Sequence, residues 1–335
     1  MGVRCLVVDD APHIVRELQD ALRRLLAAVE FLPVAQDGLE ALRRIRDHSP
    51  DLLLLDLAMP RMDGLTTLRA LGGRCAAKTI AIAPESLEGG RAAWEALTLG
   101  ARDFIVKRTI RRSGVEVETC DPIDERLRDV IEPLVGPSSD PIVAFEESAI
   151  EEEQVARLPA LVFLLETRHL GQIAHFLSRH GTRLHLPIVL QVPHPPRFTR
   201  AFREGLDRVA TMPVRIAVAG ERLAPGQAVL VPGGQLGELT GGPGNLRLKL
   251  SPIPSHRSRM RRRTAMLHAL LGSQAAQTGV AVADRLPTEG LEVAGKAVAE
   301  HRLLRLSAPR REGDPSGFLR MVRALRVDRL SAPVA

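Results

Sequence analysis

Short apolar runs alternate with segments of helical periodicity through the first hundred residues. Runs of this length suit buried strands, and apolar positions three or four residues apart suit amphipathic helices. The predicted strands are Val3–Val8, Phe31–Ala35, Leu52–Asp56, Thr79–Ala83 and Phe104–Val106. The predicted helices are His13–Val29, Gly38–Ile45, Leu65–Leu71 and Ala92–Leu99. Regular alternation of strands and helices predicts a parallel, doubly wound α/β sheet.

The same alternation returns after a connector of different composition. The connector contains a charged amphipathic helix predicted over Asp124–Leu134, a Gly/Pro/Ser-rich hinge and an acidic run. The strands predicted beyond it are 158–165, 187–191 and 214–218, and the helices are 170–179 and 200–209. We therefore predict two α/β domains, residues 1–120 and 158–335, joined by a linker at residues 121–157.

Composition narrows the class of protein. The chain has 335 residues, and its three cysteines have neither paired nor metal-like spacing, which favours a reducing compartment. We see no signal peptide and no apolar stretch near the roughly 18 residues of a membrane span. These features predict a soluble, cytoplasmic protein without membrane insertion. The net charge is +6, but the chain has no tyrosine and one tryptophan, so stacking side chains for nucleic acid are scarce and we do not expect such binding.

Acidic residues follow the first and third predicted strands. Asp9 and Asp10 end the first, and Asp56 ends the third. These strands can be neighbours in a doubly wound sheet, and their carboxyl ends then bring the three acids together. Such a cluster needs a cation, and its oxygen ligands suit Mg²⁺. Lys107, after the fifth strand, can offer a positive charge to the same anion. This arrangement would let Asp56 act as a nucleophile toward a phosphoryl group.

These residues resemble the receiver domain of two-component response regulators. The resemblance rests on Val-Val-Asp-Asp at residues 7–10, on Leu-Asp-Leu-Ala-Met-Pro-Arg-Met-Asp-Gly at 55–64, and on the stretch from Ala96 to Lys107. It implies a flavodoxin-like receiver with Asp56 as the phosphoacceptor. It also implies Mg²⁺ held by Asp9, Asp10 and Asp56, a phosphoryl contact from Lys107, and a histidine kinase as the donor.

Two positions depart from the receiver pattern. Receivers usually carry a switch Ser or Thr after the fourth strand, but Ala83 and Pro84 have no hydroxyl here. Ser86 is near but too far along the chain. The proline expected after the lysine is replaced by Arg108. Phosphorylation chemistry is compatible with these changes, whereas its readout would be weakened or rerouted.

The second domain resembles the catalytic domain of chemotaxis protein-glutamate methylesterases, the CheB family. The matching segments are Pro195–Thr199 and Glu221–Gly234, and a receiver followed by such a domain is that family's layout. The resemblance implies a parallel-sheet methylesterase-like domain, methyl-accepting chemoreceptors as partners, and a Ser/His/Asp triad that hydrolyses receptor glutamyl esters or amides.

The triad itself transfers poorly. The nucleophile position falls on Glu166, the histidine position on Pro193 with His194 next to it, and Glu289 is the remaining candidate for the acid. A carboxylate nucleophile would give a labile anhydride. Ser148 also follows an apolar run, but it lies too far before His194 for the family pattern. We therefore interpret Glu166, His194 and Glu289 as remnants and predict a pseudoenzyme or binding module.

Two alternatives remain open from the sequence. The first is an active methylesterase or glutamine deamidase with shifted catalytic residues. The second is a DNA-binding regulator that uses the basic stretch His256–Arg263, which holds five arginines in eight residues. No DNA-binding helix pair is visible after residue 240, so a solvated basic surface or an acidic partner's site suits this stretch better.

Overall fold

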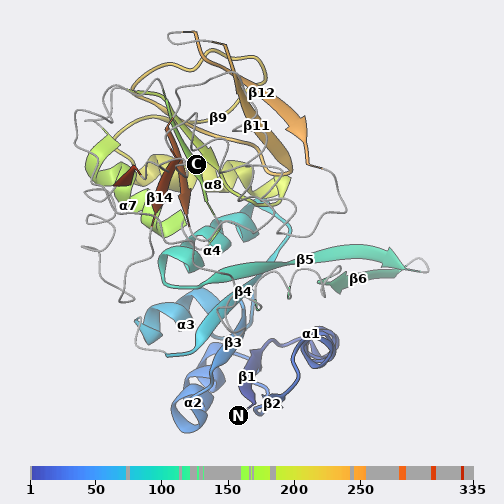
Figure 1. Cartoon of the computed structure of the whole chain (residues 1–335). Coiled ribbons are helices and arrows are strands. Elements are labelled where there is room, and N and C mark those ends of the chain that lie inside the picture. Colours follow the sequence, from blue (N-terminus) through green and yellow to red (C-terminus); the bar gives the residue numbers. More distant parts are fainter. Residues whose placement is uncertain are drawn as a thin grey trace, which may run out of the picture. The chain divides into compact units, whose positions relative to one another are not determined.

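The computed structural model describes the chain in segments grouped into two compact units. The described residues are 2–72, 76–112, 115–120, 127, 131, 160–165, 167, 170–181, 186–241, 245–253, 279–283, 303–306 and 326–327. The units are Met1–Ser138 and Ser139–Ala335, each with its own sheet (Figure 1). The α/β class predicted for both domains is confirmed. The predicted boundaries of the domains and the linker stay a prediction.

The first unit is built on a six-stranded sheet in the order β2-β1-β3-β4-β5-β6. Its first five strands are parallel and have the flavodoxin-like order. The strands are β1 (Val3–Val8), β2 (Val29–Phe31), β3 (Leu52–Asp56), β4 (Lys78–Pro84), β5 (Asp103–Arg112) and β6 (Val115–Thr119). The helices are α1 (Pro12–Leu25), α2 (Gly38–His48), α3 (Gly64–Leu71) and α4 (Leu87–Thr98).

Alternate residues of the central strands face opposite layers. Cys5, Val7, Leu52 and Leu54 belong to one buried cluster with the apolar face of α1. Helices α2, α3 and α4 pack next to one another in chain order. β3 is buried at every position, and its sequence is a run of four leucines that ends in Asp56.

Helix starts in the first unit depend on side-chain caps. Asp37, Asp63 and Ser86 each accept a hydrogen bond from a backbone N–H in the first turn of α2, α3 and α4. The cap at Ser86 explains why α4 begins at Leu87, five residues before the sequence pattern indicated. Apolar periodicity marks the buried face of a helix, whereas the cap sets its first residue.

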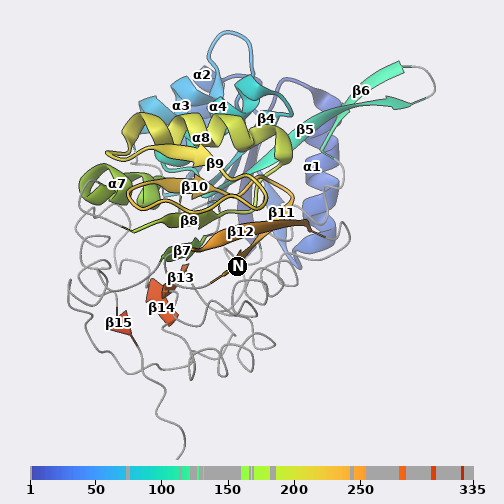
Figure 2. The same cartoon turned by 90° about the horizontal axis from the view of Figure 1, so that it is seen from above.

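The end of the sheet differs from the prediction. A three-residue strand was expected at Phe104–Val106, but β5 continues to Arg112 and pairs antiparallel with β6. The two strands project beyond the rest of their sheet in both views (Figures 1 and 2). After β6 the chain returns to the core, where Leu127 and Ile131 are helical and buried against the α1 side. These two residues lie within the helix predicted at Asp124–Leu134.

The second unit has a seven-stranded sheet in the order β15-β14-β13-β7-β8-β10-β9 (Figure 2). Every neighbouring pair is parallel except β14 with β15. The strands are β7 (Leu161–Leu164), β8 (Ile188–Gln191), β9 (Val214–Ile216), β10 (Ala228–Leu230), β13 (Gly279–Ala283), β14 (Leu303–Leu306) and β15 (Arg326–Val327).

Helices and a separate hairpin complete the described part of this unit. The helices α7 (Leu170–His180) and α8 (Thr199–Val209) pack against each other, and the 3₁₀ turn η3 (Pro196–Phe198) leads into α8. Strands β11 (Gln235–Thr240) and β12 (Arg247–Pro252) form an antiparallel hairpin. No helix among the described residues is long and apolar enough to cross a membrane.

Candidate functional site

The acids predicted to form a site converge at one edge of the first sheet. Asp9 and Asp10 follow β1, Asp56 ends β3, and β1 pairs directly with β3. One carboxylate oxygen from each acid lies within 4.8 Å of the others. Asp9 and Asp56 are buried, whereas Asp10 is exposed. The sheet therefore juxtaposes residues that are far apart in the sequence.

Lys107 bridges the two buried acids. Its Nζ lies 2.6 Å from Asp56 Oδ2 and 2.7 Å from Asp9 Oδ2. The contact with Asp56 is a hydrogen bond. Asp9 Oδ2 is at ion-pair distance but makes no aligned hydrogen bond within the described part of the chain. One cation is thus shared by two carboxylates, and the cluster keeps a net negative charge.

Burial and mutual repulsion shift the protonation of these groups. Burial raises the pKa of Asp56 to about 6; Lys107 opposes that rise and the charge of Asp9 adds to it. Burial also raises the pKa of Asp9, again against the attraction of Lys107. Burial by itself would lower the pKa of Lys107, but the two carboxylates outweigh it and raise that pKa. The cluster is therefore suited to a further cation.

The carboxylates have free coordination capacity for a divalent cation. Asp9 Oδ1 accepts from the backbone of Ala11, and Asp56 Oδ1 accepts from that of Ala58. Asp9 Oδ2 has no aligned donor among the described residues, and Asp10 faces solvent. Carboxylate oxygens with room for water are the ligands that Mg²⁺ prefers. The residues present therefore fit such an ion.

The turn after Asp56 is held by close backbone packing. A Cβ on Gly64 would lie 2.2 Å from the carbonyl oxygen of Asp56, so only glycine fits there. Asp63 caps α3 directly before this glycine. The acid–glycine pair places the first turn of α3 against the end of β3 and so positions Asp56.

The region where receivers carry a switch hydroxyl is apolar. Ala83 is fully buried in β4. The Ser86 hydroxyl accepts from the backbone of Gly89, 2.9 Å away, as the cap of α4. In place of the usual proline, Arg108 lies 3.6 Å from Glu85 in an ion pair. Ser86 therefore has a structural role that accounts for its hydroxyl.

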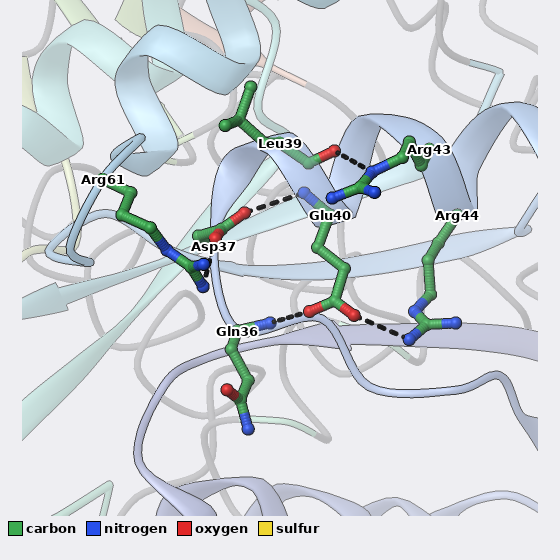
Figure 3. A network of polar contacts seen from close by, with 7 residues as sticks. All are labelled: Gln36, Asp37, Leu39, Glu40, Arg43, Arg44 and Arg61. Carbon is green, nitrogen blue, oxygen red and sulfur yellow. Dashed lines mark hydrogen bonds and ion pairs between the residues drawn. The ribbon is translucent and has the colours of Figure 1, made fainter.

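A second polar network ties the turn after Asp56 to α2 (Figure 3). Arg61 contacts the buried carboxylate of Asp37, whose other oxygen caps the helix through the backbone N–H of Glu40 at 2.8 Å. Glu40 in turn accepts from the backbone of Gln36 at 3.0 Å and from Arg44 at 2.8 Å. Arg61 has a positive φ of 64°, and its guanidinium points toward Asp37 at the start of α2 (Figure 3).

Of the three residues interpreted as triad remnants, His194 is the one that lies within the described residues. It follows β8 and is buried, with its ring 5.2 Å from that of Phe202. Nδ1 lies 2.8 Å from the carbonyl oxygen of Val192, and Nε2 lies 2.9 Å from Thr199 Oγ1. The carbonyl can only accept, so Nδ1 carries the hydrogen and Nε2 accepts from Thr199. Thr199 Oγ1 accepts from the Gly233 N–H at 2.9 Å.

This network occupies both ring nitrogens. Burial lowers the pKa of His194 to about 4, so the ring is neutral at physiological pH. A backbone carbonyl fills the place at Nδ1 where a triad needs an acid. In this arrangement His194 joins β8, α8 and the loop at Gly233. Glu166, Glu289, Ser148 and His256–Arg263 lie outside the described residues.

For two polar residues of the second unit, no role was predicted from the sequence. Thr199 links His194 to Gly233, and Gln191 joins β8 to β11. The Gln191 side chain donates to the Gln235 carbonyl at 3.0 Å and accepts from the Gly237 N–H at 2.8 Å. The sequence marks Thr199 only as a threonine at a helix start and Gln191 only as a glutamine at the end of an apolar strand. Both are weak signals of a polar contact in the core.

Family comparisons match both halves of the chain. A model described as the response regulator receiver domain matches residues 5–117, and one described as CheB methylesterase matches residues 167–283. A protein-glutamate methylesterase/protein-glutamine glutaminase 1 from Chromobacterium violaceum is 30% identical over 254 residues, which are 70% of this chain and 69% of that protein. This chain belongs to the CheB family. It is a CheB-type chemotaxis response regulator with a receiver domain and a methylesterase domain.

Other members of the CheB family match to a similar extent. The relative numbered 2 from Pseudomonas aeruginosa is 32% identical over 237 residues, covering 70% of this chain and 66% of that protein. The one numbered 1 from Oleidesulfovibrio alaskensis is 29% identical over 280 residues, covering 76% of this chain and 75% of that protein. Both relatives are called protein-glutamate methylesterase/protein-glutamine glutaminase.

Among solved structures, two come from the CheB of Thermotoga maritima. Its response regulator domain is 27% identical, with a TM-score of 0.34, and the match covers 40% of this chain and 96% of that one. Its methylesterase catalytic domain is 18% identical, with a TM-score of 0.38, and the match covers 50% of this chain and 90% of that one.

Proposed function

We propose that this CheB-type regulator accepts a phosphoryl group on Asp56 from a chemotaxis histidine kinase. The single observation that carries this proposal is the bridge from Lys107 to Asp56 and Asp9. A buried carboxylate beside a lysine and two further acids is a phosphoacceptor arrangement.

Each residue has a defined part in the transfer. An oxygen of the Asp56 carboxylate forms a bond to phosphorus while the phosphorus–nitrogen bond of the donor phosphohistidine breaks, and that electron pair stays on the imidazole nitrogen. Lys107 neutralises charge on the phosphoryl oxygens. Asp9, Asp10 and Asp56 would hold Mg²⁺, which when bound supplies further positive charge to those oxygens.

We further propose that the methylesterase domain is a binding module without hydrolytic activity. The support is the engagement of both His194 nitrogens and the glutamate at the nucleophile position. In this function the domain binds methyl-accepting chemoreceptors in the cytoplasm, and phosphorylation of the receiver controls that binding.

A labelling experiment tests the receiver proposal. Full-length protein is incubated with Mg²⁺ and labelled acetyl phosphate. In a separate reaction it is incubated with Mg²⁺ and a chemotaxis kinase that carries a labelled phosphoryl group. We expect acid-stable, base-labile label on the wild type and none on Asp56→Asn. Label that persists in Asp56→Asn would contradict the assignment of Asp56.

A hydrolysis assay tests the binding-module proposal separately. Methanol release from methylated receptor is followed with and without acetyl phosphate, and we expect none above background. Release that survives Ser148→Ala but collapses in His194→Ala would restore the alternative of an active methylesterase. A cosedimentation assay with receptor-containing membranes tests binding itself.

A further inference from the structure

The extension of β5 beyond Lys107 forms an arm that the phosphorylation chemistry does not use. We define the β5–β6 arm as residues 108–112 of β5 paired with residues 115–119 of β6. No strand of the described residues pairs with the outer edge of β6. The backbone N–H and C=O groups of such an edge are a template for one more strand.

The arm is anchored at its base. The Thr119 hydroxyl donates to Glu17 Oε1 of α1 at 2.6 Å, and Arg108 lies 3.6 Å from Glu85. Toward its tip the arm projects beyond the other strands of its own sheet (Figures 1 and 2). A ribbon of only two strands is marginally stable in water, and a third strand would stabilise it.

The two faces of the arm have different chemistry. Directly opposite residues share a face, so Ile110 and Val117 form an apolar cross-strand pair on one side. On the other side Arg111 is opposite Glu116, and Thr109 is opposite Glu118. Glu116 and Glu118 are exposed, whereas Val117 is partly buried. The outer edge of β6 therefore alternates acidic and apolar side chains.

This pattern opposes pairing between two copies of β6. In a twofold antiparallel pair within one sheet, opposite residues have the same parity, so Val117 would meet Val117. Glu116 would then meet Glu118 of the other copy at two places, and shifted registers also bring glutamates together. Directly opposite like charges destabilise a sheet. The charge pattern favours a strand of the opposite sign.

We propose that the outer edge of β6 binds an extended segment of a partner protein with lysine or arginine at alternate positions and apolar residues between them. The basic side chains would lie opposite Glu116 and Glu118, and an apolar side chain would extend the Ile110–Val117 stripe. Main-chain hydrogen bonds supply affinity in this mode, and alternate side chains supply specificity.

A peptide titration tests this surface on the full-length chain. The probe is a fluorescein-labelled octapeptide of alternating valine and lysine capped by threonines, and the readout is fluorescence anisotropy at fixed salt. We expect Glu116→Lys/Glu118→Lys to weaken binding at least about fivefold, because two attractive pairs become repulsive. A peptide with glutamate in place of lysine should bind that variant and not the wild type.

Matched controls separate strand addition from general attraction. Asp20→Lys/Glu88→Lys makes the same charge change at exposed positions outside the arm and should bind like the wild type. A peptide of equal charge with proline at two valine positions should bind at least about fivefold more weakly, because proline removes ladder donors. Trp94 fluorescence verifies that each variant is folded.

Three outcomes would overturn the proposal. They are equal affinity for the valine and proline peptides, equal weakening by the control variant, and absence of binding by the valine peptide. Concentration-dependent dimerisation of the wild type that disappears in Glu116→Lys/Glu118→Lys would assign the edge to a second copy instead.

Discussion

At the scale of single residues, burial decides what each charged or polar group of this chain can do. Lys107 lies between two buried carboxylates, and His194 lies between two hydrogen-bonding partners. Around Lys107 the carboxylates outnumber the lysine, so the cluster has a net negative charge that suits a further cation. The buried ring of His194 is satisfied and has no lone pair to offer.

Removing Lys107 should destabilise the receiver far more than removing the charge of Asp56. Lys107→Met leaves two buried carboxylates facing each other, and we expect the receiver to lose about 3–5 kcal/mol of unfolding free energy at neutral pH. Asp56→Asn leaves the one-to-one pair of Lys107 and Asp9, so we expect a change below about 1 kcal/mol, or a gain. Urea unfolding followed by fluorescence of Trp94, the chain's one tryptophan, measures both. Equal losses in the two variants would refute this account.

His194 should make the second unit sensitive to acid. Its pKa is about 4 in the folded protein, below the unperturbed value of about 6.5. The unfolded chain therefore binds a proton first, and stability falls as the pH decreases from about 6.5 toward 4. One pKa unit corresponds to about 1.4 kcal/mol, so we expect a loss of roughly 2 kcal/mol by pH 5.

The pH dependence of unfolding, followed by far-UV circular dichroism, checks this prediction. His194→Gln should flatten the difference between pH 7 and pH 5, whatever its stability at pH 7. His13→Gln removes an exposed histidine of the first unit and should keep the wild-type slope. A wild-type slope in His194→Gln would show that other groups cause the acid sensitivity.

At the scale of elements, caps and strand ends connect the phosphoacceptor site to its surroundings. The α2 cap at Asp37 receives Arg61 from the turn that follows Asp56 (Figure 3). The buried carboxylate therefore serves a helix and a loop together. Its two contacts differ in strength, because one is a helix cap and the other involves an exposed arginine.

Substitutions at this cap should separate the two contacts. Asp37→Ala removes both and should destabilise the receiver by about 2 kcal/mol. Asp37→Asn keeps a capping oxygen, and Arg61→Ala removes only the exposed partner, so each should cost less than about 1 kcal/mol. Urea unfolding followed by Trp94 fluorescence measures the loss of unfolding free energy in each of the three variants. A larger effect of Arg61→Ala than of Asp37→Ala would contradict the expected order.

Periodicity predicted the existence of most elements of the first unit but not the length of β5. The segment after Lys107 mixes arginines and glutamates with β-branched residues, and we predicted no strand within it. A half-exposed ribbon has no fully buried face, so its apolar signal is weak. This part of β5 pairs with β6, and that pairing can be seen only in the tertiary structure.

At the scale of the whole molecule, each unit has its own sheet and core, so Mg²⁺ bound at the acid cluster should stabilise chiefly the receiver's own unfolding transition. Mg²⁺ at a hundred times its dissociation constant should raise the receiver's unfolding free energy by about 2.7 kcal/mol. The transition followed by Trp94 fluorescence should therefore move on addition of Mg²⁺ and return with a chelator. The circular dichroism transition of the second unit should not move.

Acid-cluster variants control for general salt effects. Asp9→Asn/Asp10→Asn should abolish the response of the Trp94 transition to Mg²⁺, whereas Glu88→Lys, an exposed change on α4, should preserve it. If NaCl at equal ionic strength shifted the Trp94 unfolding transition as much as Mg²⁺ does, ionic screening would explain the effect. The metal site would then be rejected.

The sequence by itself determined the α/β class and the acids and lysine of the proposed phosphoacceptor site. It could do so because buried parallel strands require continuous apolar runs, and their carboxyl ends collect the polar residues that follow them. Only the tertiary structure decided how Lys107 divides between Asp9 and Asp56, where β5 ends and what His194 contacts. These features depend on distances and burial between residues that are separate in the chain, and local residue patterns carry no record of them.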